Sequence, residues 1–198
     1  LWVYPETLPR LTPPAPLVTA QLTSRLLKQL HAGANVLWLP ALDEVHSPVV
    51  TGMSSIFWNT AWTENQAPHT LGILCDPSHP LFADFPTDAH SNWQWQELLL
   101  GAKPIILDPL PHHYFPLVQL IDTWFENRKL GVVMEARFGR GKLLVCTLNL
   151  TAHPERWVAR QFLYSLQRYL SSEQCVPPHA VTLDQIKSVV AAHTREPN

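Results

Sequence analysis

The side chains best suited to binding or catalysis gather in one stretch, residues 70–100. This stretch opens on a short apolar run, Thr70–Cys75, that predicts a buried strand, and it closes on a leucine-rich run before Gly101. Asp76-Pro77 ends the first run, because proline has no amide hydrogen to donate to a strand ladder. A strand that leads through a polar loop into a helix is where open α/β sheets build binding sites. We therefore expect the first candidate site in this loop.

Trp93 and Trp95, on either side of Gln94, predict a carbohydrate platform, because indole faces stack on the apolar faces of sugar rings. Three neighbouring polar residues would supply hydrogen bonds to the sugar: Asp88, His90 and Asn92. Two further tryptophans, in the long segment 41–69, would add an aromatic wall: Trp58 and Trp62. The alternative stays open that these tryptophans pack into the core or against a neighbouring domain, where large indoles gain most from burial.

Cys75 stands at a strand end, where an α/β hydrolase would carry its nucleophile, but its surroundings do not suit that role. A nucleophile elbow needs small residues around a sharp turn, and here Asp76-Pro77 follows with no glycine. His153 and Glu155 have the His-x-Glu spacing of a partner pair. A degenerate cysteine hydrolase built from Cys75, His153 and Glu155 is therefore one alternative. Otherwise we expect no catalytic residue.

The histidines and cysteines do not predict a metal site. His112 and His113 are adjacent, and neighbouring side chains on an extended segment point to opposite faces. The three cysteines stand far apart, without the spacing of metal ligands: Cys75, Cys146 and Cys175. No glycine-rich phosphate-binding motif precedes a helix. We therefore expect neither a metal nor another cofactor.

Length and charge narrow the class of protein. The 198 residues carry 14 basic and 16 acidic side chains with no basic run, which argues against nucleic acid and membranes as partners. No apolar stretch reaches the roughly 20 residues that a membrane helix needs. We expect an α/β domain over residues 1–175 and a helical extension over 176–198. Because the chain starts at Leu1 rather than at methionine, we expect it to be a processed product or a piece of a larger protein.

Hydrophobic periodicity predicts alternating helices and strands. Apolar residues recur at helical spacing over 17–31, and the run 35–39 after Gly33 reads as a buried strand. Helix, glycine and strand in this order form half of a β-α-β unit and indicate a parallel sheet. Phe138–Lys142 predicts a β-hairpin, because its glycines permit positive φ. The other predicted elements are strands at 2–4, 104–107 and 117–125, and helices at 154–171 and 183–192.

Several short motifs in a fixed order carry a resemblance to known proteins. The first are Gly72-Ile73-Leu74, His79-Pro80, Phe85-Pro86-Thr87 and Asn92-Trp93-Gln94-Trp95. Further along the chain are Gly139-x-Gly141-Lys142, before an apolar strand, and a closing helix with Ala159–Leu166. Over residues 20–172 the chain resembles the C-terminal region of large bacterial glycoside hydrolases of family 2 type. It is also similar to class I glutamine amidotransferase-like domains, including the trimerisation domain of some β-galactosidases.

The resemblance implies a flavodoxin-like α/β fold, in which helices flank a mainly parallel sheet with a hairpin near Phe138–Lys142. Because the cysteine elbow of the amidotransferases is missing, it implies a non-catalytic accessory domain that supports domain packing or oligomer assembly. Its partners would then be other domains of the same polypeptide, further copies of the chain, and carbohydrate. The family favours a periplasmic or secreted location. A carbohydrate-binding module built on Trp93 and Trp95, and a degenerate cysteine hydrolase, are the two alternatives.

Overall fold

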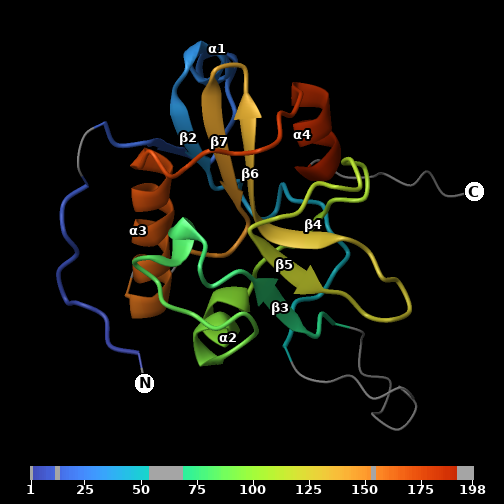
Figure 1. Cartoon of the computed structure of the whole chain (residues 1–198). Coiled ribbons are helices and arrows are strands. Elements are labelled where there is room, and N and C mark those ends of the chain that lie inside the picture. Colours follow the sequence, from blue (N-terminus) through green and yellow to red (C-terminus); the bar gives the residue numbers. More distant parts are fainter. Residues whose placement is uncertain (1, 12–13, 54–68, 153–154, 191–198) are drawn as a thin grey trace, which may run out of the picture.

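A mixed sheet of seven strands forms the centre of the molecule (Figure 1). The computed structural model describes residues 2–11, 14–53, 69–152 and 155–190. Along the sheet the strands follow the order β1-β2-β7-β6-β5-β3, and the short strand β4 also pairs with β6. Their bounds, in chain order, are β1 (Leu17–Thr19), β2 (Asn35–Trp38), β3 (Gly72–Cys75), β4 (Ile105–Ile106), β5 (Val118–Ile121), β6 (Leu130–Phe138) and β7 (Gly141–Cys146).

The prediction of a mainly parallel, flavodoxin-like sheet is wrong. Of the strand pairs described, β1 with β2 and β2 with β7 run parallel, whereas β7 with β6, β6 with β5, β5 with β3 and β4 with β6 are antiparallel. For the pairs β5–β6 and β6–β7 the cause is the short connection, because a parallel crossover needs a dozen or more residues and a short turn brings the next strand back antiparallel. The expected hairpin is present: Phe138 pairs with Gly141, and Gly139 takes the positive φ of 61° that the turn requires.

In the described part of the chain, four α-helices and one short 3₁₀ helix surround the sheet. They are α1 (Ser24–Ala32), η2 (Pro80–Phe82), α2 (Trp93–Leu99), α3 (Trp157–Ser171) and α4 (Leu183–Val190). The helix predicted over 17–31 is only partly correct, because its first residues form β1. The Thr23 hydroxyl accepts a hydrogen bond from the Leu26 amide and so fixes the start of α1. Gly33, at a φ of 122°, ends α1 as predicted.

The two faces of the sheet carry separate apolar cores, and the alternation of side chains along each strand divides the residues between them. On β7, Leu144 and Cys146 pack in the first core with α2 and α3, while Leu143 and Val145 pack in the second core with α1 and α4. The sheet is therefore covered by helices on both faces. No helix among the described residues is long and apolar enough to cross a membrane.

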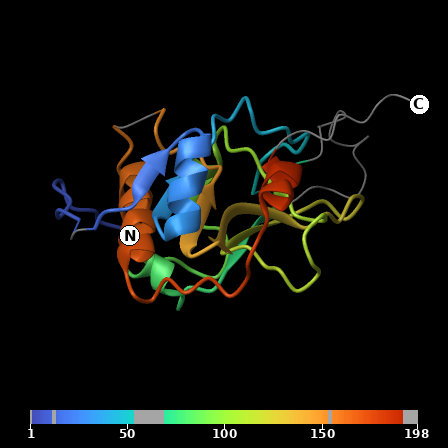
Figure 2. The ribbon, with the colours of Figure 1, turned by 90° about the horizontal axis from the view of Figure 1, so that it is seen from above.

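The N-terminal segment, residues 2–11, runs along the outside of α3 (Figure 2). The Arg160 guanidinium donates to the backbone carbonyls of Pro5 and Glu6, at 3.0 and 2.9 Å. The Tyr4 ring stacks on Phe85, with ring centroids 6.0 Å apart. The segment is held by side chains rather than by a sheet, so the strand predicted at 2–4 is wrong.

Candidate functional site

The two tryptophans of the predicted sugar platform lie in opposite environments. Trp95 is completely buried, with its ring against Phe85 and Phe162, and its indole nitrogen donates to the Thr87 hydroxyl at 2.8 Å. Trp93 is 75% exposed. The structure therefore leaves one accessible indole at this place and not two. The other two predicted aromatics, Trp58 and Trp62, lie outside the described residues.

The polar residues expected around the platform stay close together at the surface and hold the loop in shape. Asn92 caps α2, since its side-chain oxygen accepts from the Gln94 amide at 3.1 Å, and its amide nitrogen donates to the Asp88 carboxylate at 3.1 Å. His90 forms an isolated antiparallel bridge with Leu74. Residues 88–91 thus run along the outer edge of β3. The sequence predicts a buried strand here, but β3 is the last strand of the sheet and its Leu74 side chain is exposed. We assign these residues a structural role.

Cys75 is held in a neutral form that suits neither nucleophilic nor metal chemistry. Its thiol donates to the Asp88 carbonyl at 3.3 Å. Burial, together with the nearby carboxylates of Asp76 and Asp88, raises the pKa of Cys75 to about 11. The thiolate is the reactive form of cysteine, so at neutral pH Cys75 is a poor nucleophile. Of its proposed partners, His153 lies outside the described residues, and Glu155 follows directly after that gap.

A buried acidic group lies between the sheet and α3. The Glu135 carboxylate, on β6, accepts a hydrogen bond from the Tyr169 hydroxyl at 2.6 Å, and the His79 ring packs against the Tyr169 ring. Burial raises the pKa of Glu135 and lowers the pKa of His79, because both charged forms lose hydration there. The His79 Nδ1 atom also accepts from the Leu81 amide and so caps η2. We interpret this cluster as a structural link between β6, η2 and α3.

His79 makes the stability of the fold depend on pH. Its folded-state pKa lies below the ordinary value of 6.5, so its contribution to stability is present above pH 6.5 and is lost as the pH falls toward the folded-state pKa. His79→Asn keeps a side-chain cap for η2 but removes the titration. Urea unfolding at about pH 7.5 and about pH 5.5 should therefore show a larger loss of stability in the parent than in the variant. Equal losses in the two proteins would contradict this role.

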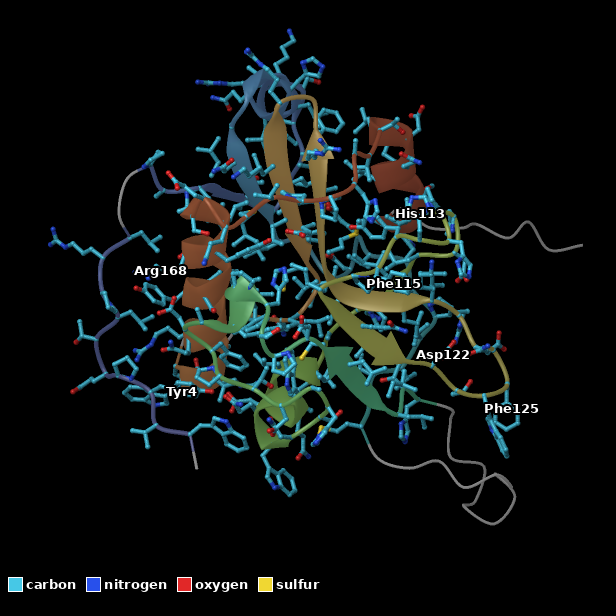
Figure 3. All side chains as sticks on the ribbon, viewed as in Figure 1. Tyr4, His113, Phe115, Asp122, Phe125 and Arg168 are labelled. Atoms are coloured by element: carbon cyan, nitrogen blue, oxygen red, sulfur yellow. The ribbon has the colours of Figure 1, made fainter. Side chains whose placement is uncertain are left out.

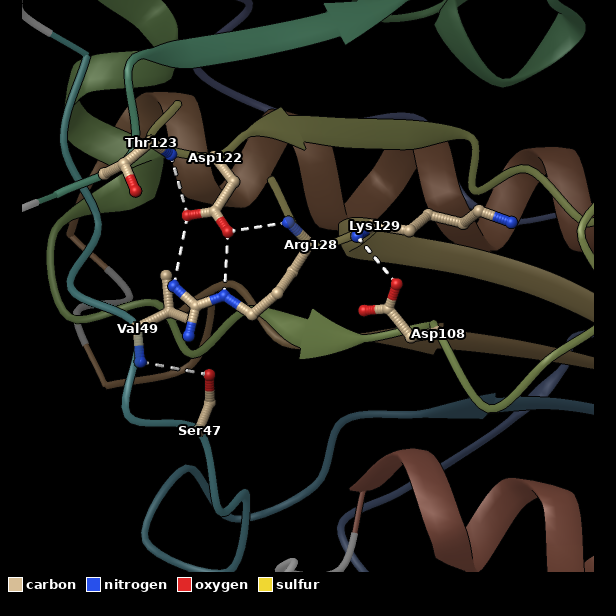
Figure 4. A network of polar contacts seen from close by, with 7 residues as sticks. All are labelled: Ser47, Val49, Asp108, Asp122, Thr123, Arg128 and Lys129. Carbon is tan, nitrogen blue, oxygen red and sulfur yellow. Dashed lines mark hydrogen bonds and ion pairs between the residues drawn. The ribbon is translucent and has the colours of Figure 1, made fainter. Parts of the chain in front are cut away.

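A well-formed polar site that the sequence does not predict lies in the loop between β5 and β6. We call residues 122–129 the aromatic loop. Its base is an ion pair in which the Arg128 guanidinium binds the Asp122 carboxylate through two nitrogens, at 2.7 and 3.1 Å (Figure 4). The Asp122 carboxylate also accepts from the backbone amides of Thr123 and Arg128, at 2.8 and 2.9 Å. Four donors thus converge on one carboxylate.

In this Asp122–Arg128 ion pair, which we call the clamp, the Asp122 carboxylate has both a counter-charge and backbone hydrogen-bond donors. Burial alone would raise the pKa of Asp122, but the hydrogen bonds from Arg128 and Thr123 outweigh burial and hold that pKa below its ordinary value. The Asp122 side chain is nearly inaccessible. Asn127 completes the loop, with a φ of 49° that asparagine tolerates and an amide that donates to the Thr123 carbonyl at 2.9 Å. Hydrogen bonds within the loop therefore close it at both ends.

Two large aromatic side chains project from this clamped loop. Trp124 and Phe125 are 62% and 58% exposed, and their rings meet edge to face with centroids 5.2 Å apart. Figure 3 shows Phe125 at the outer end of the loop and Asp122 at its base. Large exposed aromatics of this kind are characteristic of binding surfaces. The only sequence signal for them is an aromatic pair in a segment of otherwise polar residues, between Asp122 and Arg128.

A cleft of about 1170 Å³ lies beneath the aromatic loop. Three parts of the described chain line it: the loop after β2, the β4 region with the aromatic loop, and α4. Its polar side chains are Asp43, His46, Ser47, His69, Lys103, Asp108, Asp122, Thr123, Glu126, Arg128 and Ser188. Phe125 is one of its apolar walls. Among the described residues no group of three or more His, Cys, Asp or Glu side chains could hold a metal ion.

Comparison with known proteins identifies a family for this chain, and the description of that family names no activity. No curated protein matches the chain. One family matches residues 17–191, from β1 to just beyond α4, so that it includes both cores, the aromatic loop and the cleft. The chain therefore belongs to the family described as "Domain of unknown function (DUF8487)".

Proposed function

We propose that this chain is a non-catalytic accessory domain of a multidomain bacterial glycoside hydrolase and packs against another domain of the same polypeptide through its aromatic loop. The observation that carries the proposal is the exposure of Trp124 and Phe125 on a loop clamped by the Asp122–Arg128 ion pair. The glycoside hydrolase context comes from the motif resemblance in the sequence.

A clamped loop is well suited to protein contact. Interface energy concentrates in a few aromatic or arginine side chains that enter pockets on the partner. Ordering flexible side chains and loops reduces the affinity of an interface, and a loop already fixed in shape avoids most of that loss. Trp124 and Phe125 support each other edge to face, so the aromatic pair is presented in one arrangement.

The state of the cysteines supports a role without catalysis. Burial raises the pKa of Cys146 to about 12 and, with the Glu135 charge, that of Cys175 to about 11, and Cys75 also titrates near 11. Each is therefore a neutral thiol at physiological pH. Glu135, one of the two buried acidic residues in the described part of the chain, accepts a hydrogen bond from the Tyr169 hydroxyl inside the fold.

The double substitution Trp124→Ser with Phe125→Ser tests this proposal. Both side chains are exposed, so the stability of the chain alone should change by less than about 0.5 kcal/mol. In the full polypeptide, the unfolding transition of this domain should fall by several degrees, because the docking contact that stabilises it is lost. Calorimetry of both forms measures the difference. Trp93→Ser, at another exposed tryptophan, is the matched control and should leave the transition unchanged. An unchanged transition in the double variant would reject docking through the loop.

A further inference from the structure

We propose that the cleft beneath the aromatic loop binds a small neutral polyhydroxylated molecule, a mono- or disaccharide, with Thr123 and Arg128 as its hydrogen-bonding anchors. The cleft shares Phe125 with the docking surface, but its anchors Thr123 and Arg128 take no part in the proposed docking contact, and saccharide binding is tested on the chain alone.

The first observation is an unsatisfied hydroxyl group in the wall of the cleft. Thr123 is 3% exposed, and its Oγ1 atom has no hydrogen-bond partner. Buried hydroxyl groups are almost always paired, because leaving one without a partner is unfavourable. Figure 4 shows the Thr123 hydroxyl on the same side of the loop as the Arg128 guanidinium. Because Oγ1 is itself covered, the Thr123 side chain must turn about its Cα–Cβ bond before a ligand hydroxyl in the cleft supplies the partner that the described residues do not.

The second observation is the unused part of the Arg128 guanidinium. Its Nε and Nη2 atoms bind Asp122, and the third nitrogen makes no hydrogen bond to any described residue. In Figure 4 this nitrogen is turned toward the Ser47–Val49 segment, which forms another wall of the cleft. Arginine only donates hydrogen bonds. The site therefore needs a ligand with acceptor oxygens.

The charges around the cleft define the class of ligand. Asp122 and Arg128 neutralise each other, which leaves Asp43, Asp108 and Glu126 against Lys103. This acidic balance disfavours an anion such as phosphate. A cationic amine would meet the carboxylates but offers no acceptor to the guanidinium. A sugar hydroxyl both donates and accepts, so vicinal hydroxyls satisfy both kinds of group.

The size of the cleft and one of its walls are compatible with a sugar ring. Its volume of about 1170 Å³ is large enough for one or two rings. Phe125 adds an apolar wall at the loop side, against which the C–H face of a sugar ring can lie.

The test is a titration of the ¹⁵N-labelled full chain, followed by NMR, with methyl β-glucoside and lactose as probes. Inorganic phosphate and spermidine serve as the anionic and cationic comparisons. The signals to follow are the Thr123 amide and the Nε–H of Arg128. Either saccharide should produce saturable shifts of both signals, while phosphate and spermidine should not.

Thr123→Val and Thr147→Val form a matched pair of variants. Both side chains are buried with an unpartnered hydroxyl, but Thr147 does not line the cleft. Valine keeps the shape and removes the hydroxyl, so both variants should fold. Thr123→Val should weaken saccharide binding about three- to tenfold, the usual effect of losing one hydrogen bond. Thr147→Val should bind as the parent does.

Three results would overturn the inference. They are the absence of saturable shifts with both saccharides, stronger binding of phosphate or spermidine than of the saccharides, and unchanged saccharide binding in Thr123→Val. The docking proposal stands or falls separately, because Trp124→Ser with Phe125→Ser is judged by the unfolding of the full polypeptide and needs no sugar.

Discussion

Trp95→Ala should lower the free energy of unfolding by about 4 kcal/mol, whereas Trp93→Ala, two residues earlier, should change it by less than about 0.5 kcal/mol. Trp95 is fully buried in an aromatic cluster with Phe85 and Phe162, so truncation removes apolar contacts and leaves a cavity. It also removes the donor that satisfies the Thr87 hydroxyl. The Trp93 ring is mostly in solvent and loses little when it is removed.

Urea unfolding followed by circular dichroism measures both effects, and the small change expected for Trp93→Ala serves as the control. Trp95→Phe is a useful third variant, because phenylalanine keeps an aromatic ring in the cluster but not the indole donor. We expect its loss of stability to lie between those of the other two. Similar losses for Trp93→Ala and Trp95→Ala would contradict the placement of α2 against α3.

Asp122→Asn should lower the free energy of unfolding by about 2–3 kcal/mol, because it leaves Arg128 without a counter-charge in a largely buried site. Four donors converge on this carboxylate, and an amide group cannot accept all of them. The same change should loosen the aromatic loop, whose base it opens. Thermal or urea unfolding, with the amide exchange of residues 123–127, measures both effects.

The double variant Asp122→Leu with Arg128→Met is the control for this prediction. Replacing both charges with apolar side chains leaves no buried charge unpaired, so much of the stability should return. Acid unfolding gives a second check. The folded-state pKa of Asp122 lies below its ordinary value of 3.8, so its contribution is present above that pH and is lost as the pH falls through the folded-state pKa. If Asp122→Asn is as stable as the parent, the ion pair is a surface contact of little consequence.

Elements with strong local signals were predictable from the sequence. The hairpin between β6 and β7 follows from its glycines, and the end of α1 follows from Gly33. The directions of the remaining strands were not predicted correctly. The polar turn Asn127–Lys129 between two apolar runs is, however, a sequence sign of antiparallel pairing. In β1, tertiary pairing with β2 overrides the helical spacing of residues 17–31.

The candidate site was harder to predict, for two physical reasons. Residues two apart on a helix point about 200° from each other, so Trp93 and Trp95 at the start of α2 cannot face the same ligand. The cleft, in contrast, joins segments far apart in the sequence: the loop after β2, the β4 region, the aromatic loop and α4. No periodicity marks Asp122 and Arg128 as partners. Only the folded chain brings these groups together.

Hydrogen exchange at the amides of Trp124 and Phe125 tests the proposed accessory role most directly. Neither amide donates a hydrogen bond to another described residue, so both should exchange rapidly in the chain alone. In the full polypeptide we expect both amides to exchange at least about tenfold more slowly, because the aromatic loop is then covered by a neighbouring domain. The Trp93 amide should exchange equally in both forms. Equal exchange of Trp124 and Phe125 in the two forms would show that the loop stays in solvent and would contradict the proposed function.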